Sequence, residues 1–296
     1  MDSVPVDDRG LLLGDGLFET ILVEAGRFQA FEAHAERMIR GCAVLGLPAP
    51  APDWLRAAAQ TTLREAGLEG ERAAVRLTWT AGSGGRGLER PALPRPRLIV
   101  RAASALAPAG PASLASDDIR RNAHSPASRL KTLCYLDNVL ARRAALAAGA
   151  DEALMLNTES EIAGGAAANL FWIAQGRLYT PALDCGVLDG IMRAQVLAAA
   201  VEVGVEVLEV RAAADELAGA EGVFLTNSLI GLRAVGEIDG RPVPRSALIS
   251  RLASEYQQAV NNIAAIERYQ SDMFAVVAQP FFVNTQIPIT VWCRRD

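Results

Sequence analysis

The chain has 296 residues, of which 51% are hydrophobic and 21% charged, and its formal net charge is -5. This size and composition fit a globular protein of one large or two small domains. The acidic balance, without any block of basic residues, argues against nucleic acid as the main partner. There is no run of 18 apolar residues and no apolar segment at the N-terminus, so we expect no membrane span, no secretory signal and a cytoplasmic location.

Cysteine and histidine are too few and too scattered for the common metal sites. The four cysteines form no Cys-x-x-Cys pair, so neither a disulfide framework nor a zinc knuckle is predicted. The two histidines, His34 and His124, exclude a three-histidine site, and there is no Gly-x-Ser-x-Gly elbow to support a serine hydrolase. We therefore expect no bound metal.

The first hundred residues are predicted to mix strands and helices. The pattern predicts a hairpin over 19–31, helices over 34–45 and 54–66, and strands over 73–80 and 97–102. The next segment, 103–116, is rich in Ala, Pro and Ser and carries no charge. We interpret it as a linker between an N-terminal domain, residues 1–102, and a C-terminal domain, residues 117–265.

The C-terminal domain is predicted to mix helices and short strands. Its expected helices are 132–148, 191–203 and a short one near 213–218. Its expected strands are 152–157, 170–174, 177–180, 205–210 and 222–226. Strands and helices do not alternate regularly, which argues against a doubly wound parallel sheet. Residues 266–296 are poor in alanine, and we treat them as a tail without an assigned role.

The single lysine is the first candidate functional residue. Of 29 basic residues, 28 are arginines and one is Lys131. Arginine can replace lysine as a surface charge, but it cannot readily act as an amine nucleophile or form a Schiff base. A lone lysine is therefore a candidate for amine chemistry, and an ordinary surface position is the alternative.

Three further motifs bear on ligand binding. His34 and Arg37 lie one helical turn apart, where an arginine can hold a phosphate through two hydrogen bonds, although a solvated helix face is the simpler interpretation. Gly190 precedes a predicted helix whose free N–H groups would attract an anion. Residues 82–87 match Gly-x-Gly-x-x-Gly, but prolines follow where the helix of a dinucleotide site should begin, so we interpret them as a flexible loop. A lysine, an arginine and a helix start are the parts that pyridoxal phosphate requires.

These residues belong to a series of motifs that resembles the class IV, or fold-type IV, pyridoxal-phosphate enzymes. Eight strings occur in order over residues 4–260: GDGLFET, HAERM, GSGGRG, RLKTLCYLDNVLAR, DEALMLN, AAANLFW, YTPALDCGVLDGIMR and FLTNSLIGLRAV. The family contains branched-chain aminotransferases, D-amino acid aminotransferases and 4-amino-4-deoxychorismate lyases. The AANLFW, GIMR and TNSLIG strings are most similar to the lyases.

The resemblance implies a fold and a set of cofactor contacts. The fold is α+β, similar to that of D-amino acid aminotransferases, with a small N-terminal α/β domain and a larger C-terminal mixed domain that binds pyridoxal 5'-phosphate. Lys131 matches the lysine that forms the Schiff base, and Arg37 matches the phosphate-binding arginine. The family also implies a homodimer whose partner contributes to each site. The other expected cofactor-binding positions are Gly190, Ile191, Met192, Asn227 and Ser228.

The chain departs from the family at one important position. The family has a glutamate five residues before the equivalent of Asn169, where it keeps the pyridine nitrogen protonated, but here Gly164 occupies that place. Glu159 and Glu161 are out of register on a strand. Without the carboxylate we expect a neutral nitrogen and a weaker electron sink. Transamination needs that sink more than elimination does, and on this reading a glutamate restored at position 164 should raise turnover.

The resemblance thus implies a carbon–oxygen lyase of folate biosynthesis that converts 4-amino-4-deoxychorismate into pyruvate and 4-aminobenzoate, with activity weakened by Gly164. Two alternatives stay open: a class IV aminotransferase acting on D- or branched-chain amino acids, and a degenerate homologue that binds the cofactor without turnover. Our candidates for substrate contact are Thr20, Arg86 and Arg233, and for Arg233 a structural role is slightly favoured.

Overall fold

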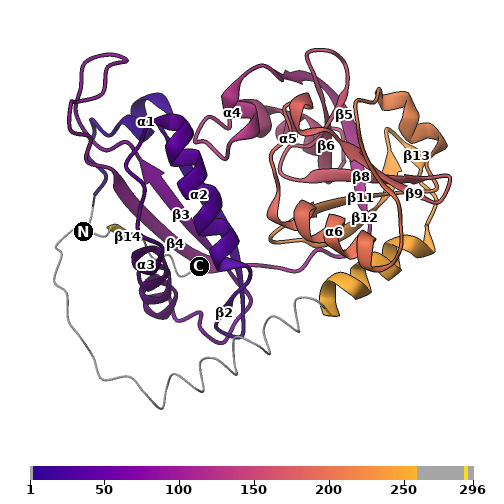
Figure 1. Cartoon of the computed structure of the whole chain (residues 1–296), viewed down its shortest axis with the longest axis horizontal. Helices are drawn as coiled ribbons and strands as arrows, with labels where there is room; N and C mark the ends of the chain where they lie inside the picture. Colours follow the sequence, from indigo (N-terminus) through magenta and orange to yellow (C-terminus); the bar gives the residue numbers. More distant parts are fainter. Residues whose placement is uncertain (1–2, 259–289, 293–296) are drawn as a thin grey trace.

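The computed structural model describes residues 3–258 and 290–292, which form two lobes, each built around its own sheet (Figure 1). Each lobe also has its own buried hydrophobic core, and Leu17 to Ala102 span the core of the first. No described helix combines the length and the apolar character needed to cross a membrane. The two-domain α+β fold expected from the resemblance is confirmed.

The first lobe contains a five-stranded sheet in the order β14-β4-β3-β1-β2. Neighbouring strands are antiparallel, except that β14 pairs in parallel with β4. Helices α2 and α3 pack on the sheet and on each other. The strands are β1 (Gly16–Glu24), β2 (Arg27–Phe28), β3 (Ala73–Thr80), β4 (Arg97–Ser104) and β14 (Thr290–Trp292). The helices are α1 (Arg9–Leu13), α2 (Phe31–Leu45) and α3 (Pro52–Glu65).

The hairpin of β1 and β2 and the helix α2 that follows it form one wall of the cavity described below. Ala25 and Gly26 both have positive φ, which closes the tight turn between β1 and β2. In α2 the buried side chains recur at helical spacing, so the helix lies along the sheet with one apolar face. The polar positions within that buried face, His34 among them, are therefore held against β1.

The second lobe contains a nine-stranded mixed sheet in the order β10-β9-β8-β11-β12-β5-β6-β7, with β13 beside β12. The pairs β9–β10, β5–β12 and β5–β6 are parallel, and the other pairs are antiparallel. Its strands are β5 (Ala112–Arg121), β6 (Glu152–Asn157), β7 (Ile162–Gly165), β8 (Asn169–Ala174), β9 (Arg177–Pro181), β10 (Val207–Val210), β11 (Gly222–Asn227), β12 (Gly231–Ile238) and β13 (Arg241–Pro242).

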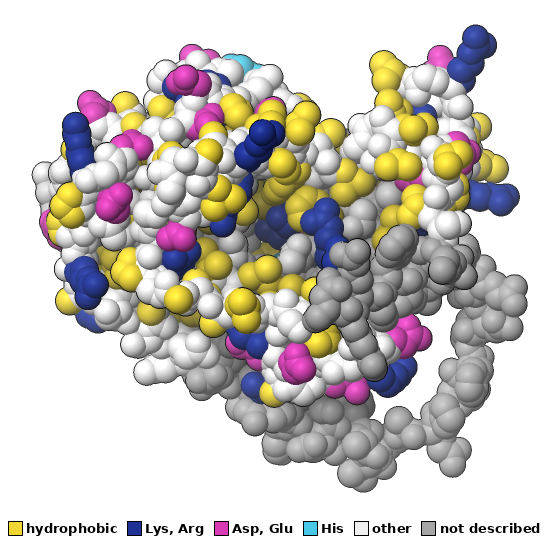
Figure 2. Space-filling model, turned by 180° about the vertical axis from the view of Figure 1, so that it is seen from behind, with side chains coloured by type: hydrophobic (Ala, Val, Ile, Leu, Met, Phe, Trp, Pro, Cys, Tyr) yellow, Lys and Arg dark blue, Asp and Glu magenta, His cyan; other side chains and the backbone are white. Residues whose placement is uncertain are grey.

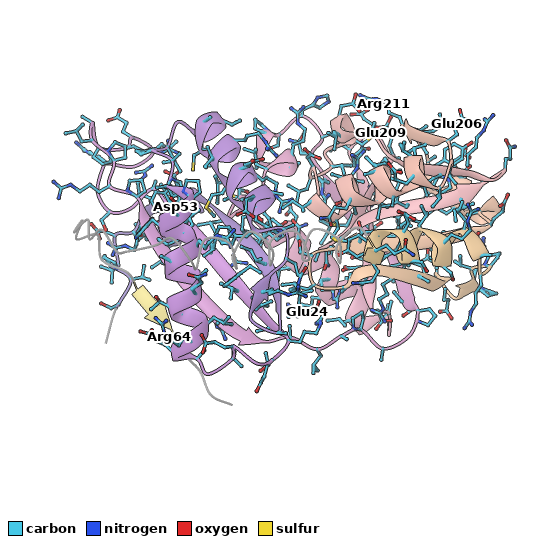
Figure 3. The ribbon with its side chains drawn as sticks, turned by 60° about the horizontal axis from the view of Figure 1, so that its bottom comes forward. Glu24, Asp53, Arg64, Glu206, Glu209 and Arg211 are labelled. Atoms are coloured by element: carbon cyan, nitrogen blue, oxygen red, sulfur yellow. The ribbon has the colours of Figure 1, made fainter. Side chains whose placement is uncertain are left out.

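Helices cover this sheet on its surface. Helix α5 packs on β5 and β6, and α6 packs on β10 and β11. The helical elements are α4 (Pro126–Arg129), α5 (Leu136–Ala147), α6 (Ile191–Glu202), the 3-10 helices η1 (Leu183–Cys185) and η2 (Ala214–Gly219), and residues 247–258. Figure 3 shows Glu206, Glu209 and Arg211 on the outer side of this lobe, where Glu209 pairs with Arg193 of α6.

One predicted helix needs correction, and the reason bears on function. The helix expected over 132–148 begins only at Leu136. The backbone before it is bound to the first lobe instead: the Phe18 N–H donates to the Lys131 carbonyl at 2.9 Å, and the Leu133 N–H donates to the Gly16 carbonyl at 3.1 Å. These bonds across the two lobes hold Lys131 in an extended turn at their junction.

The segment between the two sheets is also shorter than the 103–116 expected for a linker. Strand β4 continues to Ser104 and β5 begins at Ala112, so only 105–111 lie between them. Strands β5, β7 and β12 were not predicted as such. The tail expected at 266–296 lies outside the described residues, except for the three of β14.

Candidate active site

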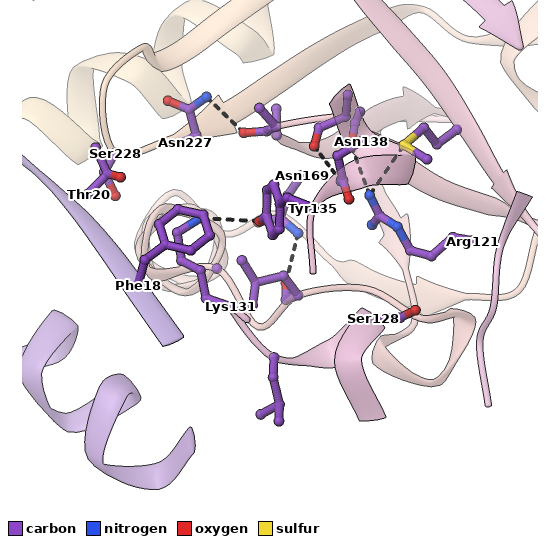
Figure 4. A pocket seen from close by; sticks show the side chains of 18 of the residues that line it. Phe18, Thr20, Arg121, Ser128, Lys131, Tyr135, Asn138, Asn169, Asn227 and Ser228 are labelled. Atoms are coloured by element: carbon purple, nitrogen blue, oxygen red, sulfur yellow. Dashed lines mark hydrogen bonds between the residues drawn. The ribbon is translucent and has the colours of Figure 1, made fainter. Parts of the chain in front are cut away.

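A cavity of about 600 Å³ lies between the two lobes. From behind, Figure 2 shows a hollow there that contains basic and hydrophobic side chains. The first lobe contributes Phe18, Thr20, Arg37 and Arg76 to its lining. The second lobe contributes residues from β5, the Lys131 turn, α5, the β7–β8 region, the start of α6 and the end of β11, several of which Figure 4 labels.

Lys131 presents its amine to this cavity between two aromatic side chains. Its Nζ lies 3.3 Å from the Tyr135 hydroxyl and 4.3 Å from the centroid of the Phe18 ring. The Phe18 and Tyr135 rings contact each other edge to face, with centroids 4.9 Å apart. The backbone of Lys131 is anchored to β1, and its amine contacts both aromatic rings from that anchored position.

A buried network of three charged or titratable groups lies behind the cavity. Glu19, only 1% exposed, accepts two hydrogen bonds from Arg37 at 2.8 and 2.6 Å and lies 2.7 Å from His34 Nδ1. His34 Nε2 lies 3.2 Å from the Ser228 hydroxyl of the second lobe. Arg37 also donates to the Asp189 carbonyl at 3.0 Å, directly before α6. The network therefore holds Arg37 against the start of α6 and links it, through Glu19 and His34, to Ser228.

The charges in this network follow from burial and pairing. Burial alone would raise the pKa of Glu19, but the hydrogen bonds and charges of Arg37 and His34 bring that pKa down to about 2. Desolvation lowers the pKa of His34 despite the opposing effect of Glu19. Burial opposes the charge of Arg37, but Glu19 raises the pKa of its guanidinium. At neutral pH the network is a carboxylate, a guanidinium and a neutral imidazole that donates from Nδ1.

The start of α6 forms a cradle for an anion. Gly190 is its N-cap, and the first N–H groups of a helix have no partner within the helix. A Cβ on Gly190 would lie 2.0 Å from Asn169 Oδ1, so only glycine fits without displacing Asn169. Thr226 supplies a further donor, because its fully buried hydroxyl lines the cavity and has no hydrogen-bond partner among the described residues. All these groups are donors suited to phosphate oxygens.

The cavity brings together most of the residues expected from the sequence. Its lining includes Thr20, Arg37, Lys131, Gly190, Ile191, Met192, Asn227 and Ser228. The Asn227 side chain is occupied, since its amide donates to the Ala167 carbonyl and its oxygen accepts from two backbone N–H groups. It therefore shapes the turn after β11 and leaves Ser228 and Thr226 to face the cavity.

Two substrate candidates lie elsewhere in this chain. Arg86 is exposed on the loop between β3 and β4 and does not line the cavity. Arg233 donates to the carbonyls of Gly110 and Pro111 and pairs with Asp151 at 3.0 Å, so it ties β12 to the segment before β5. That is the structural role that the sequence slightly favoured for Arg233.

Gly164 does not line the cavity, and its conformation explains why it is a glycine. Its φ is +110°, and a Cβ there would lie 2.9 Å from the Ala168 carbonyl. The backbone resists any side chain at this position, so the structure favours no gain in turnover from a glutamate at 164, contrary to the expectation from the sequence. Glu161 does not substitute, since it is engaged by Asn157 and Arg211.

Sequence reasoning did not single out several residues that line the cavity. Arg76 and Arg121 are buried or half-buried arginines on β3 and β5, and nothing local marks them among 28 arginines. Tyr135 lies four residues after Lys131, a spacing that could have identified it had the helix not been predicted to begin too early. Thr226 was read only as the end of a strand.

Comparison with known proteins places these features in a family. Residues 16–238 match the profile of the amino-transferase class IV family. A branched-chain-amino-acid aminotransferase of Pseudomonas aeruginosa is 31% identical over 221 residues, which cover 72% of this chain and 71% of that protein. A crystal structure from Legionella pneumophila, of a "Putative 4-amino-4-deoxychorismate lyase", is 31% identical with a TM-score of 0.82, over 87% of this chain and 96% of that one.

The chain belongs to the class IV aminotransferase family. Members of the family are pyridoxal-phosphate-dependent enzymes and include both lyases and aminotransferases, so this chain is a pyridoxal-phosphate-dependent enzyme. A solved branched-chain amino acid aminotransferase from T.th., 29% identical with a TM-score of 0.78 over 87% of this chain and 89% of that one, was crystallised with pyridoxamine 5'-phosphate. The cavity fits such a cofactor, since it combines one amine with a cluster of phosphate donors that includes the unpartnered Thr226 hydroxyl.

Proposed function

We propose that this enzyme is a 4-amino-4-deoxychorismate lyase that releases pyruvate and 4-aminobenzoate. The observation that carries the proposal is Gly164, whose backbone has no room for the carboxylate that would stabilise a protonated cofactor nitrogen. Elimination with a leaving group in place and an aromatic product depends least on that stabilisation. The likeness to the Legionella pneumophila protein supports the same reaction.

The residues of the cavity suit such a reaction. Arg37, the start of α6 and the Thr226 hydroxyl would hold the cofactor phosphate, and Lys131 would bind the cofactor covalently. Ser228 would lie beside the phosphate with its hydroxyl donating to His34. When bound, pyridoxal phosphate withdraws electrons from the substrate carbon that carries the amine. The Lys131 Nζ, once displaced by the substrate amine, is placed to accept the proton from that carbon, and the Tyr135 hydroxyl at 3.3 Å holds it there.

Arg76 is suited to recognise a carboxylate of the substrate. It lines the cavity with its guanidinium carbon 3.6 Å from the Phe18 ring centroid, and it donates to the Thr78 hydroxyl. No carboxylate pairs with it among the described residues, and desolvation lowers its pKa. A buried cation without a partner favours an anionic ligand, and 4-amino-4-deoxychorismate carries two carboxylates. Thr20, which pairs with Arg76 across β1 and β3, is a second candidate for contact with the substrate.

The deciding experiment measures pyruvate release by the purified, cofactor-loaded enzyme. With 4-amino-4-deoxychorismate we expect one pyruvate per 4-aminobenzoate without any keto acid, and none with Lys131→Ala. Since the chain has one lysine, borohydride should trap the cofactor on a side chain only at Lys131. Turnover that requires a keto acid and a D- or branched-chain amino acid would establish the aminotransferase instead, an alternative that the Pseudomonas aeruginosa relative favours. A trapped cofactor without either activity would indicate a degenerate homologue.

We also propose that the enzyme works as a cytoplasmic homodimer in folate biosynthesis. Helix α5 supports the dimer, because it exposes Leu136, Val139 and Leu140, which are 68%, 57% and 40% exposed. An apolar helix face of this kind is usual at subunit interfaces. The loop that carries Arg86 would then be free to contact the site of the partner subunit.

A further inference from the structure

Arg121 is an arginine of the cavity wall that the reaction described above does not use. It is the last residue of β5 and is half-buried. Its Nη1 donates to the Ala163 carbonyl at 3.1 Å, and its Nη2 donates to the Gly165 carbonyl at 3.2 Å. These two carbonyls flank Gly164, so the guanidinium lies alongside the one position that has no side chain.

The charge of Arg121 has no direct counter-ion. Among the described residues no carboxylate is hydrogen-bonded to it, and its remaining contacts are the Gly186 carbonyl and the Met155 sulfur, both at 3.5 Å. Glu152 and Asp137 act on it only at longer range, and Glu152 already pairs with Arg142 at 2.8 Å. Sulfur is a weak acceptor and the Gly186 carbonyl is distant, so one N–H of each Nη group is poorly satisfied and can turn to a better acceptor. Among the described residues Nε–H makes no hydrogen bond.

A guanidinium in this environment is energetically unfavourable unless a ligand supplies further hydrogen-bond acceptors. A charge removed from water loses solvation, which hydrogen-bonding partners must restore. Desolvation lowers the pKa of Arg121, but arginine still stays protonated in proteins. Arg121 can therefore only donate hydrogen bonds, and it does not give up a proton. An atom of a ligand that accepts from Arg121 in the cavity therefore stays unprotonated.

The position of Arg121 indicates which part of the cofactor it meets. Figure 4 shows Lys131 and Arg121 on opposite sides of the view, with Tyr135 and Asn169 between them. In pyridoxal phosphate a lysine amine attacks the aldehyde carbon, which is attached to the ring at the position para to the ring nitrogen. With Lys131 bound at that carbon and the phosphate at the start of α6, the nitrogen points away from Lys131.

We propose that Arg121 donates a hydrogen bond to the pyridine nitrogen of the bound cofactor and thereby keeps that nitrogen unprotonated. The proposal rests on the cofactor placement of the proposed function, but not on its choice of reaction. The proposal also relates Arg121 to the absent glutamate. Where the family has a carboxylate beside the nitrogen, this chain has the guanidinium of Arg121 next to position 164. A glutamate there would also lie against the guanidinium and cancel its charge.

The test is the ¹⁵N resonance of enzyme loaded with ring-¹⁵N pyridoxal phosphate, read at neutral pH without substrate. We expect the wild type to show the chemical shift of unprotonated pyridine. Arg121→Glu, which places a carboxylate at the same wall, should shift the resonance to that of pyridinium. The matched control is Arg120→Glu, because Arg120 precedes Arg121 on β5, does not line the cavity and donates to the nearby Asp117 carbonyl. This control should leave the resonance unchanged.

A pyridinium resonance in the wild type would overturn the proposal, and so would an unchanged neutral resonance in a folded, loaded Arg121→Glu. If that variant does not fold or load, Arg121→Met is read instead: loss of the hydrogen bond should move the resonance from that of hydrogen-bonded pyridine to that of free pyridine, and an unchanged resonance would overturn the proposal. Failure here is separable from failure of the proposed function. A neutral nitrogen without pyruvate release would refute the lyase activity but not the role of Arg121. Pyruvate release by an enzyme with a pyridinium nitrogen would refute the role of Arg121 but not the lyase activity.

Discussion

At the scale of single residues, the environment of each charge decides what it can do. Glu19, on β1, faces Arg37 and His34 of α2 and is almost completely buried. Its carboxylate compensates the guanidinium, so Arg37 can be buried beside the cavity and still offer a donor to a phosphate. His34 stays neutral because burial lowers its pKa more than Glu19 raises it, and the neighbouring Arg37 charge lowers that pKa further.

The neutral state of His34 predicts a pH dependence of stability. Its pKa in the folded protein is lowered from 6.5, so the unfolded chain binds the proton more readily and stability falls as pH drops below about 6.5. Glu19 adds to this only between its ordinary 4.5 and about 2. We expect the free energy of unfolding in urea to decrease between pH 7.5 and 5, and His34→Gln to flatten this slope.

The second histidine provides the control for this experiment. The His124 side chain is 84% exposed and lies 3.8 Å from Glu159, so His124→Gln should keep the wild-type slope. If His34→Gln has the same slope as the wild type, His34 is not the group that titrates.

Gly164 gives a prediction about strain. Because its φ is +110° and a Cβ would lie 2.9 Å from a backbone oxygen, Gly164→Glu should cost about 1–3 kcal/mol of stability without raising turnover. Gly70→Glu is the control, since nothing lies within 4 Å of its Cβ, and it should change stability by less than about 0.5 kcal/mol. Urea midpoints and pyruvate assays measure both effects. A stable Gly164→Glu enzyme with faster turnover would contradict this account.

At the scale of elements, the site is assembled from ends and edges. Strand β1 holds the Lys131 turn through its backbone, α2 carries Arg37, and α6 begins at the cavity. The tight approach of Gly190 to Asn169, whose amide donates to the Leu188 carbonyl at 2.9 Å, fixes where α6 begins. The free N–H groups of that first turn are thereby aimed at the same point as Arg37.

This geometry makes α6 sensitive to one methyl group. Gly190→Ala should push Asn169 aside and raise the dissociation constant for pyridoxal phosphate by roughly tenfold, equivalent to about 1.4 kcal/mol. Gly219→Ala should have no effect, because its Cβ meets nothing within 4 Å. Absorbance titration of the apo-protein with pyridoxal phosphate measures both constants. An unchanged affinity in Gly190→Ala would mean that the start of α6 does not bind the phosphate.

At the scale of the whole molecule, the two lobes meet through few but specific contacts. Ser228 reaches His34, Arg72 donates to the Leu229 carbonyl, and the Lys131 turn lies on β1. All three contacts surround the cavity. The active site is therefore also the place where the lobes are joined, and a bound cofactor that touches both should stabilise the whole fold.

The exposed face of α5 predicts the oligomeric state. Replacing Leu136 and Val139 together by glutamate should weaken a dimer by roughly 2 kcal/mol or more, because buried apolar anchors would become charged. Val201→Glu on α6 replaces a side chain that is 71% exposed on another helix and serves as the control. Sedimentation equilibrium measures the dissociation constant of the dimer for the wild type and for each variant. A wild type that sediments as a monomer would refute the homodimer.

The sequence by itself determined much of the local structure. Helical spacing of apolar residues located α2, α3 and α6 to within a few residues. Alternation located β3, and a short apolar run located β6, both at their observed bounds. The lone lysine, Arg37 and Gly190 were identifiable because their chemistry or their place at a helix start is itself a local property. Such signals depend on neighbours within one or two turns of the chain.

Only the tertiary structure decided how these parts meet. Ser228 contacts His34 across 194 positions and Arg37 contacts Asp189 across 152, distances at which sequence periodicity carries no information. The same holds for Arg121, which became distinct from 27 other arginines only when the fold placed it between the carbonyls that flank Gly164. Burial decides which partners a charged side chain has and how strongly it interacts with them. Burial depends on how the two lobes pack, and not on the local segment that carries the residue.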